Sequence, residues 1–119
     1  MNTLIASPTN IIATTKVAWI SKRHELTPGQ EYLLKQLHSP VIINHHKRSF
    51  DSPTQCVNYV RHLTSAGYEV YMSPVRHDMY RALRRTNLRW RFFPGYNSRG
   101  VYVTFGVIEM IGYRSIAII

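Results

Sequence analysis

Three short basic segments contain most of the side chains that are suited to chemistry on a charged ligand. They are Lys22-Arg23-His24, His45-His46-Lys47-Arg48 and Arg76-His77. An arginine guanidinium grips a phosphate group with two parallel hydrogen bonds and also stacks on bases. Three such segments in one small chain therefore favour a site for a phosphate-bearing anion. The other interpretation is that a basic protein places solvated cations in its loops.

A second basic group follows the third segment. It consists of Arg81, Arg84 and Arg85. Because these arginines are spaced three and four residues apart, they share one face if the stretch is helical. Tyr80 and Tyr96 lie near them in sequence and offer rings on which bases can stack, whereas the alternation around Trp90 explains that residue as part of the core.

Histidines support an alternative in which the chain cleaves a phosphodiester. One histidine would act as base and another as acid, and a lysine or arginine would stabilise the developing charge. The candidates are His24, His45, His46 and His77, with Arg23 and Lys47 for the charge. A cationic edge that only binds has the same composition, so we favour a binding module over an enzyme.

Other kinds of site lack the residues that they need. No H-E-x-x-H motif is present and Cys56 is the single cysteine, so we expect no metal site. Ser21, Ser49 and Ser73 lack the G-x-S-x-G elbow of a serine hydrolase. No strand-like stretch leads into G-x-G-x-x-G or G-x-x-x-x-G-K-[ST], so we expect no nicotinamide, flavin or other cofactor.

Each basic segment follows a strand-like stretch and comes before a helix-like one. In the first unit, residues 17–20 predict a strand and residues 22–25 a loop. Thr27 then predicts a helix N-cap, with Pro28 at the first helical position and Gln30 closing a capping box. The side chains that we expect this helix to bury are Leu33, Leu34 and Leu37.

The second unit repeats this pattern. Residues 41–43 predict a strand, residues 45–48 a loop, and Ser52-Pro53-Thr54-Gln55 the same kind of helix start. We expect this helix to bury Cys56, Val60 and Leu63, and to end near Gly67, which suits the left-handed position after a helix.

The third unit leads into a different periodicity. Residues 68–72 predict a strand, and Ser73-Pro74 opens a helix through about Thr86, with an apolar set of Val75, Met79, Ala82 and Leu83. Alternating apolar residues then predict a half-buried strand over residues 88–93. We expect residues 101–105 to form its hairpin partner. Residues 107–119 predict one bent strand or two short strands.

These elements predict a small Rossmann-like three-layer α/β domain, with three βα units followed by a C-terminal antiparallel β meander. Residues 16–119 form the domain, and residues 1–15 form a flexible arm or an added edge strand. Ligands bind such sheets outside the carboxyl ends of the parallel strands, next to helix N-termini that attract anions. The expected phosphate or nucleic-acid contacts are Lys22, Arg23, His24, His46, Lys47, Arg48, Arg76, His77, Arg81, Arg84 and Arg85.

Composition supports the same class of partner. Lys and Arg number 15 against 6 Asp and Glu, for a formal net charge of +9. Such an excess attracts nucleic acid, nucleotides or nucleoprotein complexes. A single cysteine suits a reducing interior, and the N-terminal apolar stretches are too short for a signal or a membrane span, so we expect a cytoplasmic protein with no membrane partner.

The stretch from Val17 to Gln30 also resembles an opening found in small proteins of phages and other mobile genetic elements, a strand followed by Ser-Arg-His and Leu-Thr-Pro-x-Gln. A strand that leads into an Arg-His loop is similar to one in compact Rossmann-like proteins of CRISPR systems, which bind or cleave cyclic oligoadenylate. The resemblance implies a ligand at Arg23 and His24. Lys22 is an additional residue between Ser21 and that pair.

The sequence is compatible with three functions. The first is a non-enzymatic accessory or inhibitory factor of a phage or mobile element, which engages nucleic acid or a nucleoprotein complex such as a host defence complex (an anti-defence role). The second is an enzyme or binder that acts on a small or cyclic oligonucleotide. The third is a structural protein of a virion or similar assembly. An exposed strand edge near residues 116–119 would allow a homodimer.

Overall fold

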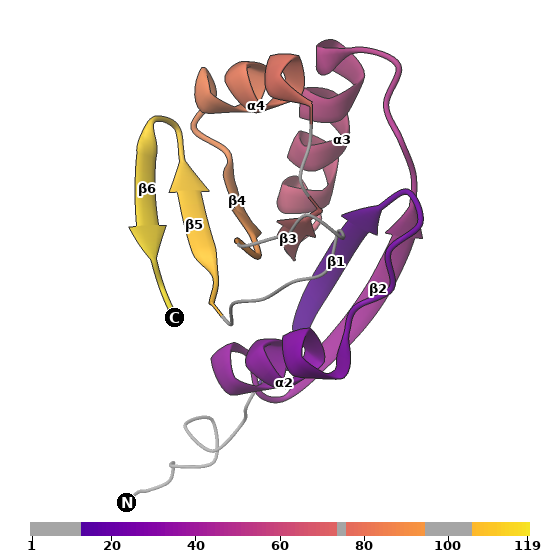
Figure 1. Cartoon of the computed structure of the whole chain (residues 1–119), viewed down its shortest axis with the longest axis vertical. Helices are drawn as coiled ribbons and strands as arrows, with labels where there is room; N and C mark the ends of the chain where they lie inside the picture. Colours follow the sequence, from indigo (N-terminus) through magenta and orange to yellow (C-terminus); the bar gives the residue numbers. More distant parts are fainter. Residues whose placement is uncertain (1–12, 74–75, 95–105) are drawn as a thin grey trace, which may run out of the picture.

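The chain folds into an α/β structure in which one mixed sheet of six strands has helices on both faces. The computed structural model describes residues 13–73, 76–94 and 106–119. In chain order the elements are β1 (Thr15–Ser21), α2 (Pro28–Leu37), β2 (Val41–Lys47), α3 (Pro53–Ser65), β3 (Tyr68–Met72), α4 (His77–Arg84), β4 (Arg89–Phe92), β5 (Ile108–Ile111) and β6 (Arg114–Ala117). Figure 1 shows α2 below the sheet and α3 and α4 above it.

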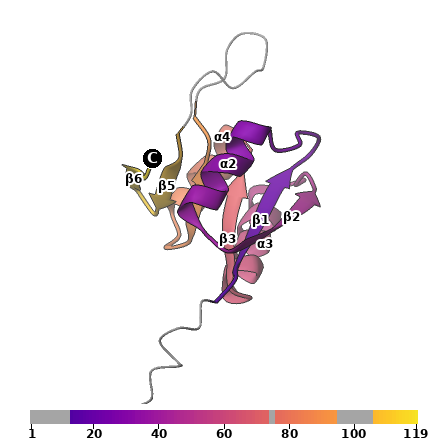
Figure 2. The ribbon, with the colours of Figure 1, turned by 90° about the horizontal axis from the view of Figure 1, so that it is seen from below.

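The strands lie in the order β2-β1-β3-β4-β5-β6. Figure 1 labels all six, and Figure 2 shows β2 and β6 at opposite ends of the sheet. β1, β2, β3 and β4 are parallel to one another, whereas β5 is antiparallel to β4 and β6 to β5. The chain steps from β1 to β2 on one side and then crosses to β3 on the other. The strand order therefore reverses between β1 and β3, which is where ligands bind in open α/β sheets.

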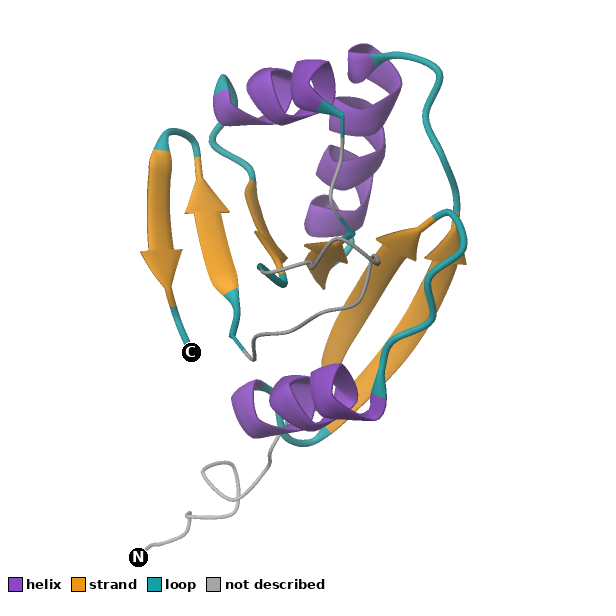
Figure 3. Cartoon of the chain, viewed as in Figure 1, coloured by secondary structure: helices purple, strands orange, loops and turns teal. Residues whose placement is uncertain are grey.

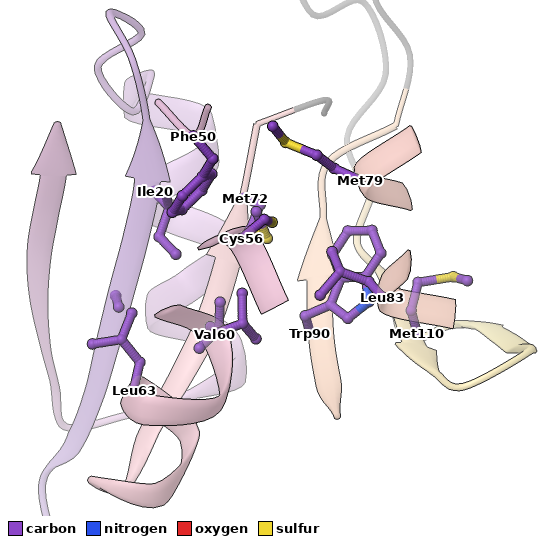
Figure 4. Close-up of a cluster of buried hydrophobic side chains, with 12 residues drawn as sticks. Ile20, Phe50, Cys56, Val60, Leu63, Met72, Met79, Leu83, Trp90 and Met110 are labelled. Carbon is purple, nitrogen blue, oxygen red and sulfur yellow. The ribbon is translucent and has the colours of Figure 1, made fainter. Parts of the chain in front are cut away.

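Two clusters of apolar side chains hold the helices to the sheet. On one face Leu33 and Leu34 of α2 pack with Trp19 and Phe93. On the other face α3 and α4 cover a cluster that contains Ile20, Phe50, Cys56, Val60, Leu63, Met72, Met79, Leu83, Trp90 and Met110 (Figure 4). Alternate residues of β1 enter the two clusters, so β1 is buried on both faces, as a central strand must be.

The helix starts follow from local sequence. Thr27 and Gln30 form the reciprocal capping box that their spacing predicts. Ser52 caps α3 by accepting a hydrogen bond from the Gln55 backbone amide. The Gln55 side chain does not return a bond to Ser52, because its Oε1 accepts a hydrogen bond from the Asp51 amide at 2.9 Å. The second capping box is therefore not reciprocal. Cys56, Val60 and Leu63 are buried, and Gly67 has φ +88° after the helix, both as predicted.

Several expectations are wrong in detail, as a comparison with Figure 3 shows. Residues 45–47 of the second basic segment are not a loop, because β2 pairs with β1 as far as Lys47. The strand over residues 89–92 is not an antiparallel addition, since it pairs parallel with β3. α4 begins at His77, and Arg76, which the expected helix includes, has an extended backbone instead (φ −59°, ψ 153°).

Some expectations fall on residues outside the described ranges. They are most of the N-terminal arm, Pro74 and Val75 at the expected helix start, and the expected strand at residues 101–105. Within the described part of the chain, β5 is the antiparallel neighbour of β4. The final apolar stretch forms two short strands around Gly112 (φ +57°), one of the two alternatives that the sequence left open.

Candidate functional site

The carboxyl ends of β1, β2 and β3 are tied together at one edge of the sheet. The backbone amide of Arg48 donates to the carbonyl of Ser21 at 3.0 Å, and that of Ser73 donates to the carbonyl of Ile20 at the same distance. Both bonds continue the pairing of the strands by one residue. The residues that follow the three strands are thereby held side by side.

A pocket of about 380 Å³ opens at this edge. Its floor is apolar and consists of Ile20, Phe50, Met72 and Met79. In Figure 4, Phe50 and Met79 stand apart from each other, with Ile20 and Met72 below them. All four belong to the core cluster under α3 and α4, so the pocket is an opening into the core.

The rim of the pocket is polar and positively charged. It consists of Ser21, Lys22, Arg48, Ser49, Ser73 and Arg76. Each of the three strand ends thus supplies one hydroxyl and one cation. No carboxylate lines this pocket, although all six Asp and Glu side chains lie within the described residues. The Ser21 hydroxyl is buried and donates to the His24 carbonyl. The hydroxyls of Ser49 and Ser73 and the three cations are groups of the kind that bind phosphate oxygens.

Aromatic rings fix the position of Arg48. Its guanidinium lies over the ring of Tyr59, 4.3 Å from the centroid, and over the ring of Phe50 at 5.4 Å. Stacking orients the planar group and leaves its edge free to donate hydrogen bonds. Within the described structure, no Asp or Glu lies within ion-pair distance of Arg48 or Lys22.

Two hydrogen bonds hold the loop that carries Lys22. The carbonyl of His24 accepts one from the Trp19 indole at 2.8 Å and one from the Ser21 hydroxyl at 2.6 Å. The resemblance to CRISPR proteins pointed to Arg23 and His24 as ligand contacts. Both are exposed on this loop, but Lys22 is the loop residue that lines the pocket.

Glu25 neutralises part of the basic segment on β2. Its carboxylate lies 3.3 Å from Lys47 Nζ and 3.3 Å from His45 Nδ1. The hydrogen bond and charge of Lys47 are the main causes that lower the pKa of Glu25, with His45 adding to them. Lys47 therefore pairs with a carboxylate instead of lining the pocket.

Glu25, His45 and Ser21 have the residue types and order of a hydrolase triad. His45 Nε2 lies 2.7 Å from Ser21 Oγ. The sequence pattern does not predict this contact, because it indicates a loop at His45. However, Ser21 is 2% exposed and its hydroxyl donates to the His24 carbonyl. His45 Nε2–H then donates to Ser21 Oγ, so the row of bonds holds the loop and leaves no free nucleophile.

The other histidines do not gather at the pocket. His46 turns to the opposite face of the sheet from His45, where Nδ1 lies 2.5 Å from the Tyr59 hydroxyl. Burial, and then the charge of His45, lower its pKa. His77 is the exposed first residue of α4. Within the described residues, no group of three potential metal ligands comes together.

The second basic group lies at the far end of α4. Arg81, Arg84 and Arg85 line a smaller hollow of about 180 Å³ together with Tyr113 of the turn between β5 and β6. At the near end, Arg76 pairs with Asp78 at 3.3 Å. The third basic segment is therefore partly neutralised, whereas the second basic group has no Asp or Glu within ion-pair distance in the described structure.

Comparison with protein-family models, curated proteins and solved structures gave no match. Among the described residues, no helix has the length and apolar character needed to cross a membrane. The pocket at the strand ends is larger than the hollow at the far end of α4, and it is the candidate functional site.

Proposed function

We propose that this chain is a non-enzymatic module that binds nucleic acid by holding phosphate groups in the pocket at the strand ends. One observation carries the proposal: Lys22, Arg48 and Arg76 surround an open pocket whose rim also has the hydroxyls of Ser49 and Ser73 and no carboxylate. Among the described residues Lys22 and Arg48 have no Asp or Glu within ion-pair distance, whereas Arg76 pairs with Asp78. Converging cations repel one another, and a bound phosphate relieves that repulsion.

Binding is favoured over phosphodiester cleavage by the placement of the histidines. Although all six histidines lie in the described part of the chain, none lines the pocket. A general base has to reach the proton that it removes, directly or through one water. His45 comes nearest, but its Nε2 contacts the buried Ser21 hydroxyl.

The proposal also includes the type of α/β fold and the biological origin of the chain. The helices on both faces and the reversal of strand order support a Rossmann-like arrangement, with β4, β5 and β6 as its C-terminal meander. The resemblance of residues 17–30 supports an origin in a phage or another mobile element. There the protein would act inside the host cell as an accessory or inhibitory factor on nucleic acid or a nucleoprotein complex.

Fluorescence anisotropy with labelled oligonucleotides tests the proposal. The probes are single-stranded DNA, RNA and duplex DNA of about 20 nucleotides, a length that exceeds the usual site of a small domain. The variant Lys22→Ala/Arg48→Ala removes two pocket cations and should weaken binding about tenfold or more. The dependence on salt should also become shallower, by roughly 0.7 per lost contact for a single strand.

A matched control separates the pocket from general charge. Lys35→Ala/Arg61→Ala removes two exposed cations on α2 and α3, so both variants lose the same two of the nine net positive charges. We expect this control to bind within about twofold of the original chain. Equal losses in the two variants would mean that the pocket has no special role.

A further inference from the structure

The hollow at the far end of α4 has the composition of a second phosphate site. Three arginines and one tyrosine line its volume of about 180 Å³. The arginines come from the end of α4 and the residue that follows it, and Tyr113 comes from the turn between β5 and β6. Residues far apart in sequence thus form one cationic hollow.

Packing at this hollow orients its central arginine. The Arg84 guanidinium lies 4.8 Å from the centroid of the Tyr113 ring and 5.5 Å from that of Tyr80. Its Nε is buried without a hydrogen-bond partner among the described residues. Like charges one turn apart destabilise a helix. Among the described residues no carboxylate lies within ion-pair distance of the three arginines, so they favour the binding of an anion.

Tyr113 adds a group that phosphate binding alone does not need. Its side chain is 66% exposed, although Arg84 lies against its ring. The turn that presents it depends on Gly112, whose φ of +57° is a conformation that glycine adopts readily. An exposed ring beside arginines is the usual platform on which an unpaired base stacks.

α4 connects this hollow to the pocket at the strand ends. Arg76 and Met79, at the start of the helix, line the pocket. Arg81 and Arg85, farther along, line both the far hollow and an intermediate hollow of about 250 Å³. The eight residues of α4 span about 12 Å at 1.5 Å per residue. Asp78 lies beside this path and is paired with Arg76.

We infer that α4 guides a single-stranded nucleic acid from the pocket at the strand ends to Arg81, Arg84 and Arg85, where one unpaired base stacks on Tyr113. The inference rests on the proposed function and specifies its ligand. A mononucleotide fills only the pocket, whereas a strand with a phosphate at every nucleotide reaches both sites. A duplex cannot stack an internal base on Tyr113, because its bases are already stacked on each other.

Binding of single strands of increasing length tests the inference. The probes are labelled oligonucleotides of about 2, 6 and 12 nucleotides, which bracket the lower end of known site sizes. The affinity of the original chain should rise steeply from the shortest probe to the longest. Arg81→Ala/Arg85→Ala should remove most of that rise and leave the binding of the shortest probe within about twofold, since the pocket is intact.

Substitution of Tyr113 tests the stacking step. Tyr113→Ala should weaken binding of the longest single strand about tenfold, because stacking on one aromatic ring is worth about that factor. Tyr113→Phe keeps the ring and should bind within about twofold of the original chain. Circular dichroism of each variant checks that the fold is kept, which we expect because Tyr113 is exposed.

The outcomes separate the two proposals. If Lys22→Ala/Arg48→Ala loses binding while the α4 and Tyr113 variants keep the dependence on length, the pocket stands and the α4 path is wrong. If the α4 variants lose binding and the pocket variant does not, the proposed function of the pocket is wrong. A duplex that binds as tightly as the single strand, with no effect of Tyr113→Ala, would overturn the inference.

Discussion

Neighbouring cations at the end of β2 have different partners. Lys47 pairs with Glu25, while Arg48 lies over Phe50 and Tyr59 and lines the pocket. Successive residues of an extended strand point to opposite sides. Here Lys47, the last residue of β2, turns to Glu25, and Arg48, the residue after it, lines the pocket. Arg48 is therefore the residue of this segment that we assign to the ligand.

The pH dependence of stability has a contribution from His46. Its pKa is lowered from 6.5 in the folded chain, first by burial and then by His45. As the pH falls below 6.5, the unfolded chain binds the proton more readily than the folded one. The stabilisation is complete above that value and is lost as the pH falls through the folded pKa. His46→Gln should therefore show a smaller drop in Tm between about pH 7.5 and 5.5.

An exposed histidine on α3 provides the comparison for this measurement. His62→Gln changes the same type of residue at a position open to solvent and should keep the original dependence of Tm on pH. If His46→Gln and the original chain lost the same Tm over this interval, the burial of His46 would have no thermodynamic effect.

A row of charged side chains crosses β3, β4 and β5 on one face of the sheet. Arg91 is 4% exposed, and its guanidinium contacts the carboxylates of Glu69 and Glu109. Burial acts to raise the pKa of Glu69, but the hydrogen bonds and charges of Arg91 and Arg89 together lower that pKa. The three strands are thereby joined through their side chains as well as their backbones.

Removal of the central cation should be costly. Arg91→Ala leaves two partly buried carboxylates facing each other, and we expect a loss of about 3–5 kcal/mol in the free energy of unfolding, measured by urea denaturation. Arg89→Ala is the control, because Arg89 pairs with the same glutamates but its side chain is 47% exposed. That variant should lose less than about 1 kcal/mol. Similar losses of stability in the two variants would show that the burial of Arg91 does not determine the loss.

The elements that sequence predicts well are those whose signals are local. Thr27, Pro28 and Gln30 form the expected helix start, and β3 has the expected bounds because its apolar residues stand between Gly67 and Ser73. The extension of β2 through His45 and Lys47 depends on pairing with β1. The parallel pairing of β4 depends on β3. The sequence of a strand does not show which other strand it pairs with.

The site shows the same division between local and tertiary information. The places of the three basic segments after parallel strands predict that they meet at one edge of the sheet. Lys22, Arg48 and Arg76 line one pocket there, whereas the expected contacts Arg23 and Lys47 do not line it. The contacts that engage Lys47 and His46 are with Glu25 and Tyr59, which are distant in sequence. Tyr113 was missed because its turn lies 28 residues beyond Arg85 in sequence, and only the folded sheet brings the two together.

At the scale of the whole molecule, β6 forms one edge of the sheet. All four of its residues are exposed, and Ile116 and Ile119 are each 45% exposed. An unpaired strand edge templates pairing with another strand, so we predict a symmetric dimer through β6. Sedimentation velocity should show association as concentration rises.

Two substitutions at opposite edges of the sheet test this prediction. Ile116→Lys should weaken association by placing a charge on the pairing edge. Ile42→Lys changes an isoleucine on β2, the other edge, that is 55% exposed, and should leave association unchanged. Sedimentation of the original chain as a monomer at the highest concentration would contradict the dimer.

The floor of the pocket belongs to the core of the protein. Ile20, Phe50, Met72 and Met79 line the pocket and also pack beneath α3 and α4. A ligand that binds only the folded chain adds to its stability, by about 2.7 kcal/mol when its concentration is one hundred times Kd. Occupancy would thus reinforce the contact between the two helices and the sheet. The empty protein would be the more easily unfolded form, and in a cell that lacked the ligand it would be the form that proteases remove first.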